Sequence, residues 1–121
     1  MAAYRPKILF ADDSEIVRRT VGMILDSVAD LTCVDDGETA LSACAAEKYD
    51  LVLLDIYMPV MDGMVTCAAL RKQGFDGPIY ALSADLEVCD RATYKAAVFS
   101  GFVPKPIQPR ELLEIALTRA A

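Results

Sequence analysis

Asp50-Leu-Val-Leu-Leu-Asp55 is a run of four apolar residues between two carboxylates. A strand that is apolar on both faces is typical of the centre of a parallel sheet, where helices cover both sides. The next segment, Tyr57-Met-Pro-Val-Met-Asp-Gly63, has the proline, aspartate and glycine of a loop. We therefore predict a central parallel strand that ends at Asp55 and leads into a loop.

Other short apolar runs predict four more strands, at residues 7–11, 31–34, 78–83 and 101–104. Apolar residues with helical spacing predict helices between and after them, holding residues 16–25, 40–45, 64–70, 86–98 and 112–116. Ser14 or Asp13 is the expected cap of the first helix. Strand and helix alternate five times, which predicts a doubly wound parallel α/β sheet with right-handed crossovers.

The composition fits one domain over residues 1–121. Twelve basic and eighteen acidic residues give a net charge of −6, and this sign disfavours direct binding of nucleic acid. The chain has no long apolar run and no signal-peptide region, so we expect no membrane insertion and a cytoplasmic location.

Four cysteines are spread along the chain without a Cys-x-x-Cys pair, and there is no histidine. They are Cys33, Cys44, Cys67 and Cys89. Without a close cysteine pair or a histidine, a zinc site is disfavoured. We predict buried free thiols that pack as small hydrophobic side chains.

Five polar side chains stand at the ends of predicted strands: Asp12 and Asp13 after the first, Asp55 on the third, Ser83 on the fourth and Lys105 after the fifth. In the flavodoxin-like strand order 2-1-3-4-5 these strand ends adjoin, so the side chains converge on one crevice. Three carboxylates in one crevice repel each other and need a cation. Mg²⁺ suits them, because it prefers oxygen ligands and keeps waters that a phosphate can replace.

Asp55 is the candidate nucleophile of this crevice, since a carboxylate can attack a phosphoryl group and form an aspartyl-phosphate. Mg²⁺ and the Lys105 ammonium would neutralise charge on the transferring oxygens, and the Ser83 hydroxyl would donate a further hydrogen bond. Each residue alone has an ordinary structural explanation, such as a helix cap or a solvated lysine. Five of them at consecutive strand ends favour the functional interpretation.

Four segments carry a resemblance to a known family. They are Asp12-Asp13, Leu53-Leu-Asp-Ile-Tyr-Met-Pro-Val-Met-Asp-Gly63, Ala81-Leu-Ser-Ala84 and Lys105-Pro106-Ile107. From Lys7 to about Leu117 the chain resembles the response-regulator receiver domains of two-component phosphorelay signalling. The resemblance implies the flavodoxin-like (βα)5 sheet with strand order 2-1-3-4-5.

By this resemblance, Asp55 is the phosphoacceptor and Mg²⁺ is the cofactor, with Mn²⁺ as a substitute. Asp13 is expected to bind the metal directly together with Asp55, and Asp12 largely through water. The backbone carbonyl of Tyr57 is expected to complete the protein's share of the metal ligands.

The resemblance also assigns the residues that respond to phosphorylation. Ser83 and Lys105 are expected to hold the phosphoryl oxygens, and the Lys105–Pro106 peptide bond is expected to be cis. Phe102 matches the aromatic residue that turns on activation. The output surface would then consist of the helix over residues 86–98, the strand over residues 101–104 and the last helix.

Because the chain has no histidine, a phosphohistidine donor must act in trans. The resemblance implies a histidine kinase or a histidine phosphotransfer protein as donor and a downstream protein as target. The chain would catalyse only its own phosphorylation and dephosphorylation. We expect the donor to dock over the site through the exposed loops and the first helix, where Ile16 and Val17 follow the acidic pair. The alternative is that both side chains belong to the core.

This sequence departs from the family pattern at four positions. Ser83 stands where threonine is commoner, and Phe102 where tyrosine is frequent. Val98 stands where glycine is common before the fifth strand, and Tyr57 is unusually bulky two residues after the acceptor. None of these departures removes a chemical group that the reaction needs. They leave the reaction as expected and leave the switching geometry and the phosphate lifetime open.

Three other functions fit the sequence less well. An aspartate-nucleophile phosphatase or phosphotransferase typically has a second carboxylate where this chain has Tyr57. A phosphorylation-independent docking module would not need all five site residues. A flavodoxin would need a hydroxyl-rich phosphate loop in place of Asp12-Asp13. Within the receiver interpretation, both a single-domain response regulator and the receiver segment of a hybrid histidine kinase fit.

Overall fold

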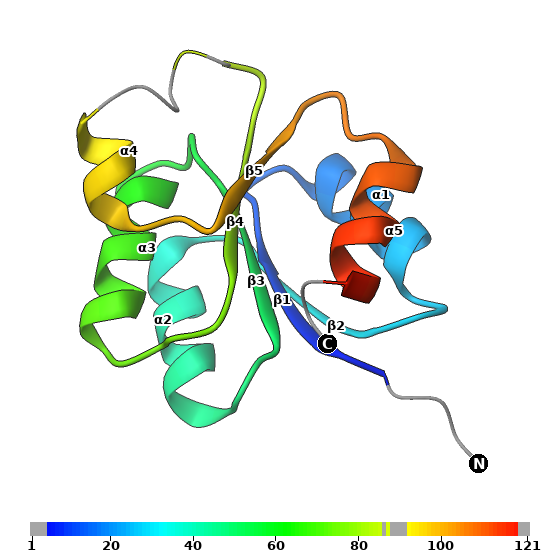
Figure 1. Cartoon of the computed structure of the whole chain (residues 1–121), viewed down its shortest axis with the longest axis horizontal. Coiled ribbons are helices and arrows are strands. Elements are labelled where there is room, and N and C mark those ends of the chain that lie inside the picture. Colours follow the sequence, from blue (N-terminus) through cyan, green and yellow to red (C-terminus); the bar gives the residue numbers. More distant parts are fainter. Residues whose placement is uncertain (1–4, 86, 88–91, 119–121) are drawn as a thin grey trace.

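A computed structural model describes residues 5–85, 87 and 92–118 of the chain (Figure 1). Its five strands form one parallel sheet in the order β2-β1-β3-β4-β5, which confirms the predicted order. The strands are β1 (Lys7–Ala11), β2 (Asp30–Val34), β3 (Leu51–Asp55), β4 (Ile79–Ser83) and β5 (Gly101–Pro104). β3 lies at the centre of the sheet, and all five of its residues are buried, as its apolar run predicted.

Helices cover both faces of the sheet: α1 and α5 lie on one side and α2, α3 and α4 on the other (Figure 1). They are α1 (Glu15–Leu25), α2 (Gly37–Ala46), α3 (Gly63–Lys72), α4 (Ala92–Ala97) and α5 (Pro109–Thr118). α4 covers the later part of the helix predicted over residues 86–98, of which residues 86 and 88–91 lie outside the described ranges. Among the described residues, no helix is long and apolar enough to cross a membrane.

The first three helices begin at side-chain caps just after the strand ends. Ser14 accepts a hydrogen bond from the backbone N–H of Val17, which decides between the two predicted caps of α1. Asp36 and Asp62 cap α2 and α3 in the same way. Each such cap stabilises its helix by about 1 kcal/mol. Because the caps lie at the carboxyl edge of the sheet, they also fix the loops that surround the crevice.

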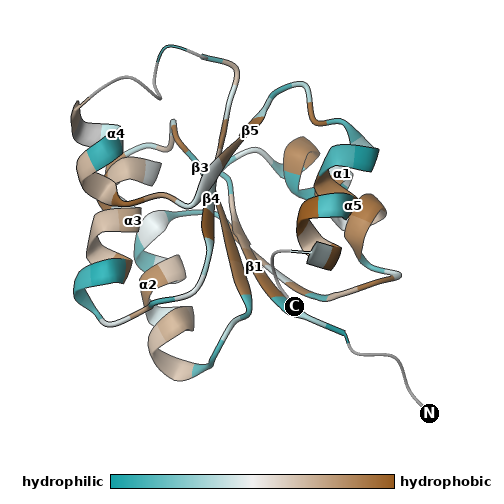
Figure 2. Ribbon diagram, in the orientation of Figure 1, coloured by the Kyte–Doolittle hydropathy of each residue, from teal (hydrophilic) through white to brown (hydrophobic). Residues whose placement is uncertain are grey.

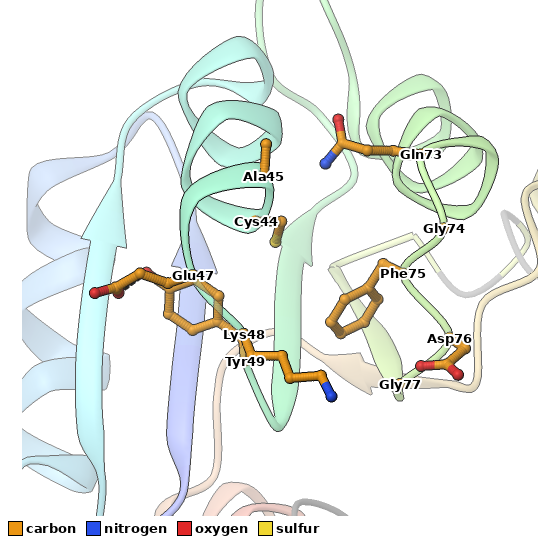
Figure 3. Close-up of a pocket in the computed structure, with 10 residues that line it drawn as sticks. All are labelled: Cys44, Ala45, Glu47, Lys48, Tyr49, Gln73, Gly74, Phe75, Asp76 and Gly77. Atoms are coloured by element: carbon orange, nitrogen blue, oxygen red, sulfur yellow. Dashed lines mark hydrogen bonds between the residues drawn. The ribbon is translucent and has the colours of Figure 1, made fainter.

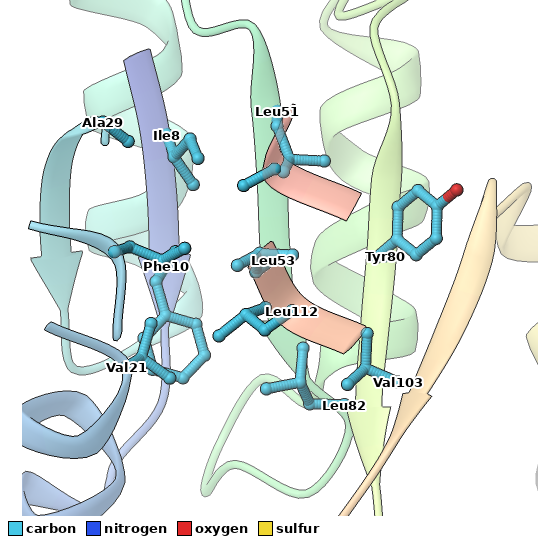
Figure 4. Packing of buried hydrophobic residues seen from close by; sticks show 12 residues of the cluster. Ile8, Phe10, Val21, Ala29, Leu51, Leu53, Tyr80, Leu82, Val103 and Leu112 are labelled. Carbon is cyan, nitrogen blue, oxygen red and sulfur yellow. The ribbon is translucent and has the colours of Figure 1, made fainter. Parts of the chain in front are cut away.

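Two apolar layers hold the helices on the sheet. On the side of α1 and α5, Phe10 and Leu53 of neighbouring strands pack beneath Leu112 of α5 (Figure 4). On the other side, Leu54 packs in the same cluster as Leu70 of α3. Neighbouring residues of one strand face opposite sides, so β3 supplies both layers. The central strands are accordingly hydrophobic along their length, whereas the helices carry both hydrophobic (brown) and hydrophilic (teal) residues (Figure 2).

Hydrogen bonds tie the end of α4 to α3. Arg71, in the last turn of α3, donates from Nε to the carbonyl oxygen of Val98 (3.1 Å) and from Nη1 to that of Gly77 (2.6 Å). The thiol of Cys67 donates to the carbonyl oxygen of Ala97 (3.1 Å). The end of α4 and the start of β4 are therefore fixed to one helix at the amino edge of the sheet.

Val98, just after α4, has a φ of 63°, a left-handed conformation that favours glycine. A β-branched residue there carries a strain of roughly 1–2 kcal/mol. This conformation accounts for the glycine that is common at this place in the family pattern, so the departure at Val98 leaves the turn intact and adds strain to it.

The cysteines that the structure describes are free thiols, as predicted. The predicted burial holds for Cys67, whereas Cys44 is half-buried. It is wrong for Cys33, which is exposed on β2 at the edge of the sheet. Cys89 lies outside the described residues. Burial raises the pKa of Cys44 to about 11 and that of Cys67 to about 12. Both thiols therefore stay protonated at neutral pH.

Candidate functional site

Three carboxylates meet at the carboxyl edge of the sheet. Asp12 and Asp13 follow β1, and Asp55 is the last residue of β3, the strand next to β1. One carboxylate oxygen of each lies within 4.8 Å of the others. Asp12 is 0% exposed and Asp55 4% exposed, whereas Asp13 is open to solvent. A cluster of buried and accessible carboxylates fits a Mg²⁺ site.

Lys105 enters the same crevice from the loop after β5. Its Nζ lies 3.1 Å from Oδ1 of Asp55 and 3.3 Å from Oδ2 of Asp12. Its backbone N–H donates to the carbonyl oxygen of Ser83 (2.9 Å), which fixes the loop to the end of β4. The predicted convergence of these charged side chains is thus confirmed. The Lys105–Pro106 peptide bond is cis, as the resemblance implied.

The charges in this crevice do not balance. Burial, and next the charge of Asp12, raise the pKa of Asp55 above its usual range, and the Lys105 ammonium only partly offsets this. Burial alone would lower the pKa of Lys105, but the charges of Asp55 and Asp12 outweigh it and raise that pKa. Lys105 is therefore a cation at neutral pH, and one ammonium faces three carboxylates. A divalent cation would neutralise the excess negative charge.

Ser83 lies at the end of β4, the strand next to β3, and is 1% exposed. Its Oγ accepts a hydrogen bond from the backbone N–H of Asp85 (2.9 Å). Oγ also lies 3.5 Å from the carbonyl oxygen of Asp85, at the limit of a hydrogen bond. The hydroxyl of Ser83 is thus bound within its own loop.

Tyr57 connects the two loops that border the crevice. Its backbone N–H donates to Oδ1 of Asp55 (3.3 Å), and its hydroxyl donates to Oδ2 of Asp85 (2.8 Å). Sequence reasoning missed Asp85. The available signal was a carboxylate two residues after Ser83, in the loop that follows a strand end, but that position alone did not show which side chain it would meet.

Phe102 lies on β5, half-buried beside a small cluster that contains the buried residues Ile56 and Ala81. Tyr94 and Phe99 also pack there, with stacked rings whose centroids are 4.8 Å apart. The ring of Phe102 therefore lies in apolar surroundings near the end of β3. Its turning remains a prediction.

The first helix presents Ile16 to solvent, because 78% of this residue is exposed. The alternative that Ile16 and Val17 both belong to the core is therefore wrong for Ile16. Val17 is half-buried against the core and lines a groove of about 250 Å³ with Thr20, Lys105 and Ile107. An apolar surface thus adjoins the crevice on the side of α1.

A different hollow, of about 380 Å³, lies between α2 and the loop after α3 (Figure 3). Its lining includes Cys44, Tyr49, Phe75 and Gly77. Tyr49 precedes β3 and Gly77 precedes β4, whereas Asp55 ends β3, so this hollow lies at the opposite edge of the sheet. The Cys44 thiol in this hollow is protonated at neutral pH, and the hollow is separate from the crevice at Asp55.

Comparison with known proteins gives the family. Residues 8–117 match the family model described as "Response regulator receiver domain". The chain therefore belongs to the receiver domains of response regulators, which are signalling proteins of two-component systems.

Two curated relatives illustrate the match. The probable transcriptional regulator ycf27 of Pyropia yezoensis is 38% identical over 113 residues, which cover 93% of this chain and 46% of the relative. The alkaline phosphatase synthesis transcriptional regulatory protein PhoP of Bacillus subtilis is 36% identical over 107 residues, which cover 88% and 45%. The chain spans about half the length of the curated relatives it matches.

Solved structures agree with this fold. The chemotaxis response regulator CheY4 of Vibrio cholerae has a TM-score of 0.87 and 30% identity, covering 98% of this chain and 100% of that one. The receiver domain of the sensor histidine kinase PA1611 of Pseudomonas aeruginosa PAO1 has a TM-score of 0.88 and 28% identity, covering 97% and 98%. That structure has a magnesium ion coordinated in its active-site cleft.

Proposed function

We propose that this chain is a single receiver domain over residues 1–121 that accepts a phosphoryl group on Asp55 from a phosphohistidine donor. The observation that carries the proposal is the position of the Lys105 ammonium, 3.1 Å from Asp55 and 3.3 Å from Asp12, beside a third carboxylate. This arrangement suits the transfer of an anionic group to a carboxylate, because the positive charge is already in place.

The acidic cluster is proposed to bind Mg²⁺, with Mn²⁺ as a substitute. Asp13, Asp55 and the backbone carbonyl of Tyr57 would bind the ion directly, and Asp12 would bind it largely through water. When bound, the ion supplies positive charge that neutralises the carboxylates and the phosphoryl oxygens. The excess of negative charge in the crevice supports this proposal.

In the transfer, a carboxylate oxygen of Asp55 attacks phosphorus while the bond from phosphorus to the donor's imidazole nitrogen breaks. The imidazole leaves with the electron pair of that bond and takes up a proton. The Lys105 ammonium is proposed to pair with a phosphoryl oxygen, and the Ser83 hydroxyl to donate a hydrogen bond to another. Hydrolysis of the acyl phosphate later restores Asp55 and releases phosphate.

The phosphoryl donor is proposed to be a histidine kinase or a histidine phosphotransfer protein. The exposed side chain of Ile16 and the groove beside Val17 adjoin the crevice, which supports docking over α1. The target is proposed to be a downstream protein that contacts α4, β5 and α5 after Ser83 and Phe102 have moved. Relatives named as transcriptional regulators support a cytoplasmic location.

Phosphorylation with acetyl phosphate and Mg²⁺ tests this proposal. Intact-mass measurement should show one added phosphoryl group, labile to hydroxylamine, on the wild-type chain. Asp55→Asn should show none. Asp50→Asn is the matched control, because Asp50 precedes the same strand at its other end and binds the backbone N–H of Lys7. Unchanged labelling of Asp55→Asn would contradict the assignment.

A further inference from the structure

A side-chain hydrogen bond joins the two loops that leave the centre of the sheet beside the crevice. Tyr57 follows β3 and Asp85 follows β4, and the Tyr57 hydroxyl donates to Oδ2 of Asp85 at 2.8 Å. A hydrogen bond from a hydroxyl to a carboxylate is short and strong compared with one between neutral groups. We call this pair the Tyr57–Asp85 latch.

Asp85 also determines the position of Ser83. Its backbone N–H donates to Ser83 Oγ at 2.9 Å, and its carbonyl oxygen lies 3.5 Å from the same Oγ. The second carboxylate oxygen of Asp85, Oδ1, accepts a hydrogen bond from the backbone N–H of Glu87 at 3.0 Å. One carboxylate oxygen therefore holds the local turn and the other holds Tyr57, while the backbone of the same residue holds the hydroxyl of Ser83.

We propose that the Tyr57–Asp85 latch restrains Ser83 in its resting position and so lowers the readiness of the site to take a phosphoryl group. Tyr57 and Asp85 are positioning residues in this role, because they act through Ser83. The inference rests on the proposed function of Asp55 as phosphoacceptor and adds a regulation of that same site.

The physical reason is a competition for Ser83. If Ser83 Oγ moves toward a phosphoryl oxygen on Asp55, as the proposed function requires, it must leave the backbone N–H of Asp85 or carry Asp85 with it. The hydrogen bond from Tyr57 opposes both movements, since it fixes the Asp85 side chain to the loop after β3. An interaction present only in the resting state shifts the equilibrium toward that state by its own free energy.

The test is a titration of the 121-residue chain with beryllofluoride, a phosphoryl mimic, in the presence of Mg²⁺. Tyr57→Phe removes only the hydroxyl and keeps the ring and the backbone carbonyl. Loss of one such hydrogen bond should make beryllofluoride bind roughly three- to tenfold more tightly. Tyr49→Phe is the matched control, because the Tyr49 hydroxyl donates to Glu47 at the opposite edge of the sheet (3.3 Å). The Tyr49→Phe variant should bind beryllofluoride as tightly as the wild type.

A purely structural role would give a different result. If the bond only stabilised the loops, Tyr57→Phe would lower the melting temperature and leave the affinity for beryllofluoride equal or weaker, and this outcome would overturn the proposal. Tighter binding by Tyr57→Phe but not by Tyr49→Phe supports it.

A double-mutant comparison tests whether Tyr57 acts through Asp85. Asp85→Ala also removes the bond to Glu87, so it serves only as a background. In that background, Tyr57→Phe should change the affinity for beryllofluoride by less than twofold, because the hydrogen bond from Tyr57 to Asp85 is already lost. A three- to tenfold gain that persists without Asp85 would mean that Tyr57 acts by another route, and the latch would be wrong.

Amide hydrogen exchange of Asp85 separates the failure of the latch from the failure of the proposed function. It is measured in the unphosphorylated chain and needs no phosphoryl chemistry. Tyr57→Phe should speed this exchange, because Asp85 loses a restraint. If the wild type binds no beryllofluoride, the proposed function fails. If the wild type binds it but Asp85 exchanges equally fast in both proteins, the latch alone fails.

Discussion

Val98 has a strained backbone conformation. Its φ of 63° lies in the left-handed region, and the residue is 58% exposed. Val98→Gly should therefore raise the free energy of unfolding by about 1 kcal/mol, since glycine adopts this conformation freely and little apolar burial is lost. Urea denaturation at neutral pH measures the change.

The control for this prediction is Val65→Gly. Val65 is similarly exposed, but it lies in the first turn of α3 in a helical conformation, with its backbone N–H bonded to the cap Asp62. Glycine there should lower the free energy of unfolding by roughly 0.5–1 kcal/mol, because it loses conformational entropy in a helix without relieving strain. Equal destabilisation by both substitutions would show that the backbone at Val98 is not strained.

Asp55 gives a prediction about pH. Its pKa in the folded chain is raised above the ordinary value of 3.8, so the native state binds this proton more tightly than the unfolded state. The contribution of Asp55 to stability is thus highest below pH 3.8 and falls as the pH rises through the native pKa. At pH 7 without divalent cations, Asp55→Asn should be more stable than the wild type.

Urea denaturation in EDTA measures this difference, with Asp50→Asn as the control that should show no gain. The advantage of Asp55→Asn should shrink as the pH is lowered toward 3.8, because the wild-type carboxyl then becomes neutral as well. A wild type that is more stable than Asp55→Asn at pH 7 in EDTA would mean that Lys105 outweighs burial and Asp12.

At the scale of one element, α1 presents two exposed apolar residues with different positions. Ile16, 78% exposed, lies in the first turn near the crevice, whereas Met23, 85% exposed, lies in the later part of the helix. Ile16→Glu should slow transfer from a phosphohistidine donor by about tenfold, the effect of losing ~1.4 kcal/mol of docking energy. It should leave labelling by acetyl phosphate unchanged, because that small donor needs no docking surface.

Met23→Glu is the matched substitution and should leave both rates unchanged. Neither change should shift the free energy of unfolding by more than about 0.5 kcal/mol, since both side chains are on the surface. Equal slowing by the two variants would indicate that general charge, and not contact at Ile16, governs the transfer.

At the scale of the whole molecule, the proposed metal site between β1 and β3 should make the free energy of unfolding depend on Mg²⁺. Mg²⁺ at ten times its dissociation constant should raise the free energy of unfolding by about 1.4 kcal/mol, because it binds only the folded chain. Asp13→Asn should remove most of this gain, and Asp12→Asn less, if Asp12 acts through water. Thermal unfolding with and without Mg²⁺ measures both effects, and an undiminished gain in Asp13→Asn would contradict its role as a direct ligand.

Much of this architecture could be predicted because it depends on local order along the chain. The burial of β3 follows from its apolar run, and the meeting of Asp12, Asp55 and Lys105 follows from the order of the strands. The hydrogen bond from Tyr57 to Asp85 could not be predicted, because it joins two loops, and the spacing of residue types in the sequence does not determine the backbone conformation of those loops. The exposure of Ile16 also required the structure, since a residue beside a half-buried neighbour in the first turn fits either side of the helix.

The hydrogen bonds that join α3 to the end of α4 restrain one end of α4. Arg71 and Cys67 donate to the carbonyl groups of Val98 and Ala97, so a shift of the last turn of α4 would break these hydrogen bonds or move α3 with it. The opposite end of α4 is the one that the chain from Ser83 reaches first. A displacement that begins at Ser83 would then move the first turn of α4 most and its last turn least, because the last turn is bonded to α3.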